Sequence, residues 1–134
     1  MALQELYLVA NLSEEEKTAG FVTTPFTIQQ LTEVIQKEEL FIAKDTNHII
    51  AYIFAGSWDF FHQWPIFNHM ISLLPELIFL DFDFTTKNSF QYGPICIHQD
   101  YRGKGLITPF FEFMRINMKS KYPLSLTFIN KINI

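Results

Sequence analysis

The sequence predicts one α/β domain over residues 1–134, with a mixed but mainly antiparallel sheet. The first observation is length, since 134 residues provide for one hydrophobic core. The second is composition, with 49% hydrophobic against 18% charged residues, the opposite of a disordered chain. The third is that apolar runs of strand length alternate with helix-capping signals along the chain.

The chain begins with a predicted strand and a short predicted helix. Residues 4–10 alternate loosely between polar and apolar side chains, which favours a strand. Ser13 and Glu16 have the spacing of a capping box, in which each side chain accepts from the other residue's backbone N–H. We therefore expect a short helix that ends by Gly20.

A second capping signal at residues 27–30 predicts a helix that runs to about Glu38. Phe26 before the cap and Leu31 after it have the spacing of a hydrophobic staple. Helical periodicity predicts one apolar face, made of Ile28, Leu31 and Ile35.

Residues 40–44 and 49–55 are two apolar runs joined by turn-forming residues, which predicts a hairpin. Beyond Gly56, residues 67–74 favour a short helix and residues 77–84 a strand. We expect Asp81 and Asp83 to lie on an exposed face of that strand.

The last third predicts a strand, a loop, a helix and a final strand. Residues 91–97 are strand-like, with a bulge expected where Gly93 and Pro94 interrupt the pattern. Residues 106–121 favour a helix and residues 124–129 a strand. Four polar residues of this helix recur at spacings of four, three and four, which predicts one polar stripe: Thr108, Glu112, Arg115 and Lys119.

Charge and cysteine content exclude several classes of protein. A net charge of −4 argues against nucleic acid as a partner. No apolar run approaches the roughly 20 residues of a spanning helix, so we expect no membrane partner. Cys96 is the only cysteine and no signal-peptide pattern opens the sequence, which predicts a cytoplasmic location. Residues 91–134 nevertheless have a net charge of +4, whereas residues 1–90 have a net charge of −8. This uneven distribution favours binding of a small anion by the last third of the chain.

The most informative segment is the turn Tyr101-Arg102-Gly103-Lys104-Gly105-Leu106, which follows an apolar strand and precedes a helix. Glycines allow the main chain to approach phosphate oxygens closely. A helix N-terminus presents backbone N–H groups and partial positive charge to an anion. The turn therefore predicts an anion site, with a solvated strand-to-helix turn as the alternative.

This segment resembles the acyl-CoA loop of the GNAT superfamily of N-acetyltransferases, whose pattern Arg/Gln-x-x-Gly-x-Gly/Ala is matched by Arg102 and Gly105. The order of elements is similar along most of the chain. The resemblance implies a GNAT-like fold, acetyl-CoA as co-substrate and a small-molecule or peptide amine as acceptor.

The resemblance also implies which residues contact the cofactor. The backbone of Ile95 and Ile97 would pair with the pantetheine arm, next to the bulge expected at Gly93. Asn130 would contact the cofactor beyond the last strand. The amides expected on the pyrophosphate are those of Arg102, Gly103, Lys104, Gly105, Leu106 and Ile107.

Two features depart from the family pattern. Ile107 occupies a position where the family has a small residue, and Pro109 removes a nearby N–H. The sequence also lacks the family's C-terminal helix and strand pair, so we expect a C-terminally short fold. Two alternatives follow: the chain is a fragment or truncated form, or a partner, such as the second copy in a homodimer, covers the exposed edge of the last strand.

The resemblance implies acyl transfer from a thioester to an amine, without a covalent enzyme intermediate. A general base helps to deprotonate the amine, and a backbone N–H near Ile97 would bind the oxyanion. Cys96 is expected to be a buried hydrophobe, not a nucleophile. No catalytic residue is assigned, and the weak candidates are His98, Tyr92 and His62, followed by the polar residues Glu39, Asp59, Asp81 and Asp83.

Two further alternatives stay open at this point. One is a CoA-binding or protein-interaction module of the same fold without turnover. The other is a binding domain for a small molecule, with phenylalanines lining an apolar cavity. Five aromatic residues lie close together in the sequence: Trp58, Phe60, Phe61, Trp64 and Phe67. They form either an acceptor-binding wall or part of the hydrophobic core, and the second role is the commoner one for aromatic clusters.

Overall fold

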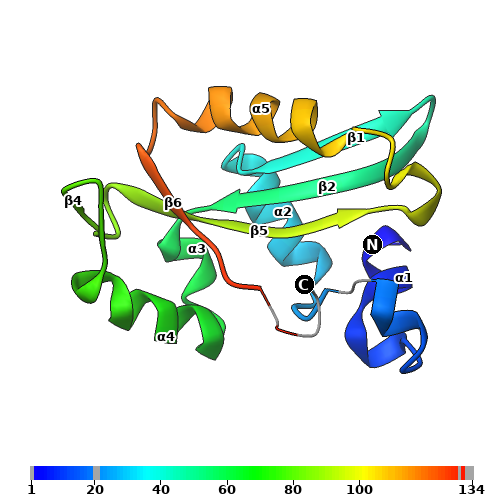
Figure 1. Cartoon of the computed structure of the whole chain (residues 1–134), viewed down its shortest axis with the longest axis horizontal. Helices are drawn as coiled ribbons and strands as arrows, with labels where there is room; N and C mark the ends of the chain where they lie inside the picture. The colour runs from blue at the N-terminus through cyan, green and yellow to red at the C-terminus, as the bar shows by residue number, and fades with distance from the viewer. Residues whose placement is uncertain (1, 20–21, 130, 132–134) are drawn as a thin grey trace.

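The computed structural model describes residues 2–19, 22–129 and 131. Helices and strands alternate along the chain after an N-terminal helical segment (Figure 1). In order, the elements are α1 (Ala2–Tyr7), η1 (Val9–Asn11), η2 (Glu16–Ala19), α2 (Ile28–Gln36), β1 (Leu40–Asp45), β2 (His48–Gly56), α3 (Trp58–Phe61), α4 (Pro65–Leu73), η3 (Leu74–Glu76), β3 (Ile78–Phe79), β4 (Phe82–Asp83), β5 (Ser89–Ile97), η4 (Gln99–Tyr101), α5 (Ile107–Met118) and β6 (Leu124–Leu126).

The main sheet has the strand order β1-β2-β5-β6 within the described part of the chain. β1 with β2 and β2 with β5 are antiparallel, whereas β5 and β6 are parallel. The predicted mixed, mainly antiparallel sheet is therefore confirmed. The α5 helix provides the crossover that a parallel pair requires, and Figure 1 shows it on one face of the sheet with α2, α3 and α4 on the other.

Each face of the sheet carries its own hydrophobic core. On the α5 face, Phe110 and Met114 of α5 form one hydrophobic core with residues of the sheet, among them Ile53 of β2. On the opposite face, Phe54 and Trp58 belong to a larger core that also takes in residues of α1, α2 and α4. Because both faces are covered, β2 is buried from Ile50 onward and lacks the alternation of a half-exposed strand.

The expected strand at residues 4–10 is wrong, because that segment forms α1 and η1. Gln4 explains the difference: it is buried, and its carboxamide bonds both backbone groups of Phe26. Its Oε1 accepts from Phe26 N at 2.8 Å and its Nε2 donates to Phe26 O at 3.2 Å. This contact across 22 positions stabilises a helix with a buried polar residue, which a local pattern does not reveal.

Both capping boxes are confirmed. Ser13 and Glu16 exchange backbone-to-side-chain hydrogen bonds of 2.7 and 3.2 Å, and the helix they begin is the 3-10 turn η2. Thr27 and Gln30 do the same before α2. The apolar face expected for α2 is partly wrong, because the fully buried residue of this helix is Val34, which the prediction did not include. The exposed fractions of the other apolar positions are 70% for Ile28 and 58% for Ile35.

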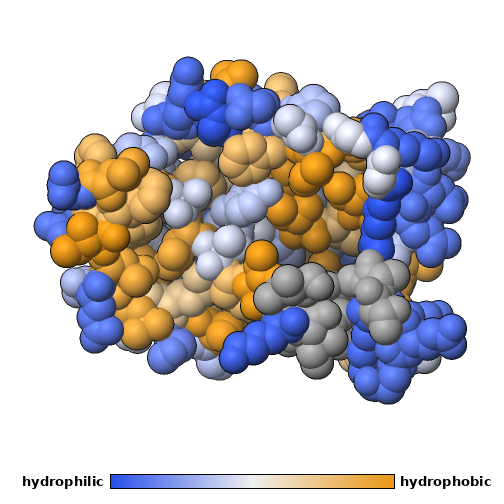
Figure 2. All heavy atoms as spheres, in the orientation of Figure 1, coloured by the Kyte–Doolittle hydropathy of each residue, from blue (hydrophilic) through white to orange (hydrophobic). Residues whose placement is uncertain are grey.

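The single strand expected over residues 77–84 is instead the two-stranded hairpin β3–β4. The chain reverses because Leu80 and Asp81 both take positive φ angles, as in a tight hairpin turn. Asp81 and Asp83 are exposed, as expected. The hairpin also exposes apolar side chains, and Figure 2 shows them as an orange area at the β4 end of the molecule; these are Ile78, Phe79, Leu80 and Phe82.

Most other predicted elements are confirmed with small shifts of their ends, but the strand expected over residues 124–129 is half as long, since β6 ends at Leu126. The hairpin β1–β2, the helix α4 and the helix α5 lie where the pattern places them. The bulge expected at Gly93 is also present, since the register between β2 and β5 shifts from Ile53–Ile95 to Ala55–Tyr92. In the described residues, no helix has the length and apolarity that a membrane crossing requires.

Candidate functional site

The candidate site begins where the parallel strands β5 and β6 separate. Their pairing covers three positions only, from Ser89 with Leu124 to Gln91 with Leu126. Two residues farther along β5, Gly93 has a φ of +100°, and the peptide bond from Gly93 to Pro94 is cis. A Cβ on Gly93 would lie 3.6 Å from Thr127 Oγ1, so the two chains are still close there. Beyond this point they form the two sides of a fork.

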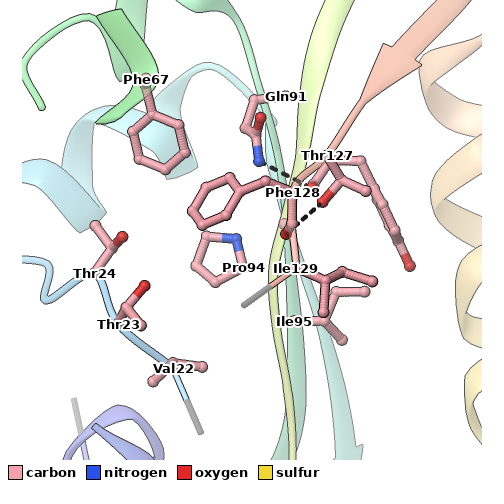
Figure 3. Close-up of a pocket in the computed structure, with 12 residues that line it drawn as sticks. Val22, Thr23, Thr24, Phe67, Gln91, Pro94, Ile95, Thr127, Phe128 and Ile129 are labelled. Atoms are coloured by element: carbon pink, nitrogen blue, oxygen red, sulfur yellow. Dashed lines mark hydrogen bonds between the residues drawn. The ribbon is translucent and has the colours of Figure 1, made fainter. Parts of the chain in front are cut away.

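A cavity of about 260 Å³ lies at this fork, open on one side (Figure 3). It is lined from β5, from the segment after β6, from α4 and from the loop before α2. None of the described residues that line it is charged. The lining residues are Val22, Thr23, Thr24, Phe67, Gln91, Tyr92, Gly93, Pro94, Ile95, Thr127, Phe128 and Ile129.

The most unusual group in the lining is the Gln91 side chain, which is 2% exposed. Its Nε2 donates to the Tyr92 carbonyl oxygen at 3.1 Å. Its Oε1 is buried and accepts no hydrogen bond in the described part of the chain. Sequence analysis did not identify Gln91, because only the fork of β5 and β6 turns this strand residue into a cavity residue.

The free edge of β5 continues from the cavity toward Ile97. His98 N donates to Ile50 O in β2 at 2.8 Å. Because antiparallel strands alternate the direction of their backbone groups, those of Ile95 and Ile97 point to the opposite edge. That edge has no β6 partner beyond Gln91. The structure thus gives Ile95 and Ile97 the orientation that pairing with an extended ligand requires.

Arg102 occupies part of this edge. Its Nε donates to the Ile97 carbonyl oxygen at 2.8 Å, and its guanidinium lies 4.6 Å from the centre of the Tyr7 ring. The side chain expected near a pyrophosphate is therefore attached to the end of β5. The carbonyl of Ile97 is engaged by Arg102, which leaves its N–H and the backbone groups of Ile95 on the free edge.

The loop after β5 divides into a bonded part and an open part. The N–H groups of Tyr101 and Arg102 donate to His98 O and Gln99 O at 2.9 and 3.2 Å. Within the described residues, the N–H groups from Gly103 to Leu106 donate to no protein acceptor. Their position before α5 adds the unpaired N–H groups of a helix N-terminus.

Both glycines of the loop have left-handed φ angles, +70° for Gly103 and +77° for Gly105. Apart from each glycine and its two chain neighbours, no atom lies within 4 Å of the point where a Cβ would be at either position. The amides of this turn are accessible, as an anion site requires. Lys104 and Ile107 are exposed beside them, and Lys104 Nζ lies 5.7 Å from the Tyr101 ring centre.

The N-terminal helix α1 supports the loop, a role that sequence analysis missed. The Tyr7 hydroxyl accepts the Gln99 N–H at 2.7 Å. The Tyr7 ring also meets the His98 ring edge-on, at 6.2 Å between centres. One tyrosine therefore contacts the start of the loop and, through its ring, Arg102.

The weak catalytic candidates do not converge on the cavity. His98 lies at the end of β5, where its Nδ1 accepts from Asp100 N at 3.3 Å. His62 is exposed at the end of α3 and is not among the lining residues. Tyr92 lines the cavity, yet its ring packs against Phe111 on the α5 face, and burial raises the pKa of its hydroxyl.

The remaining candidates have structural surroundings. Cys96 is buried, which raises the pKa of its thiol to about 11 and keeps it protonated at neutral pH. Glu39 is buried beside α3, where it accepts the Ser57 N–H at 3.0 Å, and burial raises its pKa. Asp59 is exposed on α3 and lies 3.8 Å from Lys37 Nζ.

The aromatic cluster is mainly core. Trp58, Phe60 and Phe61 are at most 2% exposed and do not line the cavity. Phe67 is the member that does, with Phe128 beside it at 5.8 Å between ring centres. Of the cofactor contacts expected from the sequence, Asn130 lies outside the described residues.

The described ranges contain no group of three His, Cys, Asp or Glu side chains arranged to hold a metal ion. Comparisons with protein-family models, with curated proteins and with solved structures find no match to this chain. The function is therefore argued from the geometry of the fork, the free strand edge and the glycine loop.

Proposed function

We propose that the protein is an acetyl-CoA-dependent N-acetyltransferase with a GNAT-like fold, which moves an acetyl group to an amine. The observation that carries the proposal is the continuity of three features along β5. The cavity at the fork leads to an uncovered strand edge, and this edge leads to a turn of unpaired amides. A long ligand with a phosphate group at one end and a reactive group at the other suits this arrangement.

The dimensions agree with an extended arm. From Gly93 to Ile97 the strand advances about 13 Å, at roughly 3.3 Å per residue. The carbonyl of Ile95 and the N–H of Ile97 would pair with the amides of a pantetheine arm, as a strand edge pairs with a peptide. The amides from Gly103 to Leu106 would receive the pyrophosphate, with Lys104 beside them.

The bound cofactor would supply an acetyl group activated as a thioester. The chain would hold this group and the acceptor amine together at the fork, and such positioning lowers the barrier substantially. An unpaired backbone N–H on the free edge of β5 would stabilise the oxyanion of the tetrahedral intermediate. The N–H of Ile95, which lines the cavity at the fork, is the candidate for this contact.

One observation favours an alternative, a CoA-binding module of the same fold without turnover. Neither His98 nor His62 lines the cavity, and Tyr92 directs its ring to the α5 face. The described lining therefore provides no side chain with the usual pKa of a general base. Release of free thiol from acetyl-CoA with a panel of amines distinguishes the enzyme from the silent binder.

Cofactor binding is tested by isothermal titration calorimetry with acetyl-CoA. The variant Gly105→Glu places a carboxylate where the phosphate would lie, and we expect at least tenfold weaker binding. Ser120→Glu is the matched control, since it adds the same charge at an exposed position beyond the other end of α5. Equal binding by wild type and Gly105→Glu would remove the cofactor site from this loop.

A further inference from the structure

The hairpin β3–β4 presents apolar side chains to solvent at one end of the molecule (Figure 2). It is tied to the rest of the fold, because Phe84 is buried in the core and Asn88 Nδ2 donates to Asp83 O at 2.7 Å. An exposed apolar surface on a fixed element is typical of a protein interface. This hairpin surface consists of four large side chains that are each more than half exposed: Ile78, Phe79, Leu80 and Phe82.

A second exposed apolar surface lies on α5. Phe113 and Ile116 are more than half exposed, and Lys119 follows at the same spacing of three, so the three side chains form one α5 stripe. The Phe113 ring meets the Phe41 ring of β1 edge-on, at 5.9 Å between centres. The stripe lies toward the C-terminal end of α5, which Figure 1 shows on the side of the molecule nearer to the hairpin.

The two surfaces lie in segments of opposite charge. Residues 76–87 have a net charge of −2, from three carboxylates and one lysine. Residues 112–121 have a net charge of +2, from three basic residues and one glutamate. Arg115 pairs with Glu112 at 2.8 Å, so the exposed Lys119 and Lys121 carry the positive charge that a partner meets. Opposite charge favours contact between the hairpin surface and the α5 stripe, whereas two facing hairpins would repel one another.

We propose that a second copy of the chain covers the hairpin surface, with the hairpin of each copy packed on the α5 stripe of the other. Such a reciprocal pair closes as a twofold-symmetric dimer, in which each contact is made twice. The interface lies away from the glycine loop, because Ile107 at the start of α5 is about 13 Å of helix from Ile116. The proposal therefore does not depend on acetyl transfer, and its contact differs from the edge of the last strand.

Charge reversal tests the reciprocal contact, with sedimentation equilibrium of the full chain as the measurement. Asp81→Lys with Asp83→Lys sets lysines against the α5 stripe of the other copy. Lys119→Glu with Lys121→Glu sets carboxylates against the hairpin. Each of these double variants should dimerise at least tenfold more weakly than the wild type. An equimolar mixture of the two brings opposite charges together at both contacts, so we expect it to form mixed dimers with the affinity of the wild type.

Leu80→Asn tests the apolar part of the contact. Leu80 has a φ of 48°, a left-handed conformation that asparagine adopts more readily than leucine, so the hairpin keeps its turn. We expect dimerisation to weaken at least tenfold, since the side chain is removed from both contacts. Ile28→Asn, at a similarly exposed position on α2, is the matched control. Glu5→Lys with Glu14→Lys controls for the change in net charge, and both controls should dimerise as the wild type does.

Three results would overturn the proposal, with circular dichroism used to verify that each variant is folded. One is a wild type that stays monomeric at about 1 mM, including one that instead binds phosphatidylcholine vesicles through the hairpin. The second is dimerisation of either charge-reversed variant as tightly as the wild type, or a mixture that stays monomeric. The third is an oligomer that keeps growing with concentration, because an open head-to-tail chain is not a closed dimer.

Discussion

Removing the Ser89 hydroxyl tests whether the base of the fork is held by a buried hydrogen bond. Ser89 begins β5, pairs with Leu124 of β6 and is 0% exposed. Its Oγ accepts the indole N–H of Trp58 at 3.0 Å and donates to Thr85 O at 2.5 Å. In Ser89→Ala the indole N–H stays buried without a partner, whereas exposed Thr85 gains water.

An orphaned buried donor costs about 1–3 kcal/mol, so we expect Ser89→Ala to lose about 2 kcal/mol of unfolding free energy. For a chain of 134 residues this corresponds to a fall of about 7 °C in Tm. Urea unfolding and a thermal melt measure the two quantities. Ser125→Ala is the control, since it makes the same change at an exposed position of β6.

A double-mutant cycle with Trp58→Phe separates the hydrogen bond from other effects. With the indole N–H removed, Ser89→Ala should cost about 1 kcal/mol less than in the wild type. The reasoning is refuted if Ser89→Ala alone stays within about 0.5 kcal/mol of the wild type, because surface substitutions have effects of that size.

Three other predictions concern single positions. Burial raises the pKa of Glu39, so its contribution to stability is fully present below pH 4.5 and is lost as the pH rises through the raised value; in Glu39→Gln, urea unfolding from pH 4 to 7 should show a smaller decline. Gly56→Ala would place a Cβ 2.5 Å from Phe61 Cε2, and we expect a loss of about 1–3 kcal/mol in the same assay. Tyr7→Phe keeps the ring but removes the hydroxyl that accepts the Gln99 N–H, so unfolding free energy should fall by about 1 kcal/mol and hydrogen exchange at Gln99 should become faster; unchanged exchange there would contradict the assigned contact.

The elements that sequence analysis predicted correctly are those with local signals. The capping boxes at Ser13 and Thr27 act within four residues, and the β1–β2 hairpin has its turn residues between two apolar runs. The element predicted wrongly depends on a distant contact. Gln4 makes α1 compatible with the core by bonding the backbone of Phe26, and no pattern in residues 4–10 contains that information.

The candidate site was predictable only where it is continuous in sequence. The turn from Gly103 to Leu106 and the bulge at Gly93 carry glycine signals that are visible in the chain. The cavity combines β5 with α4, the segment after β6 and the loop before α2, so its lining depends on the tertiary arrangement. Gln91 looks like an ordinary strand residue in the sequence, and only its place at the last β5–β6 pair, next to the fork, brings it into the cavity lining.

The absence of charged side chains from the described cavity lining also affects the protonation state of any amine that binds there. An alkylamine in water carries a proton, and its ammonium form is stabilised by hydration that an uncharged cavity wall does not fully replace. Transfer into such surroundings lowers the pKa of the amine, as it does for a buried lysine. Under the proposed acetyl transfer, an amine acceptor would bind there as its free base, and its proton would be released to solvent on binding.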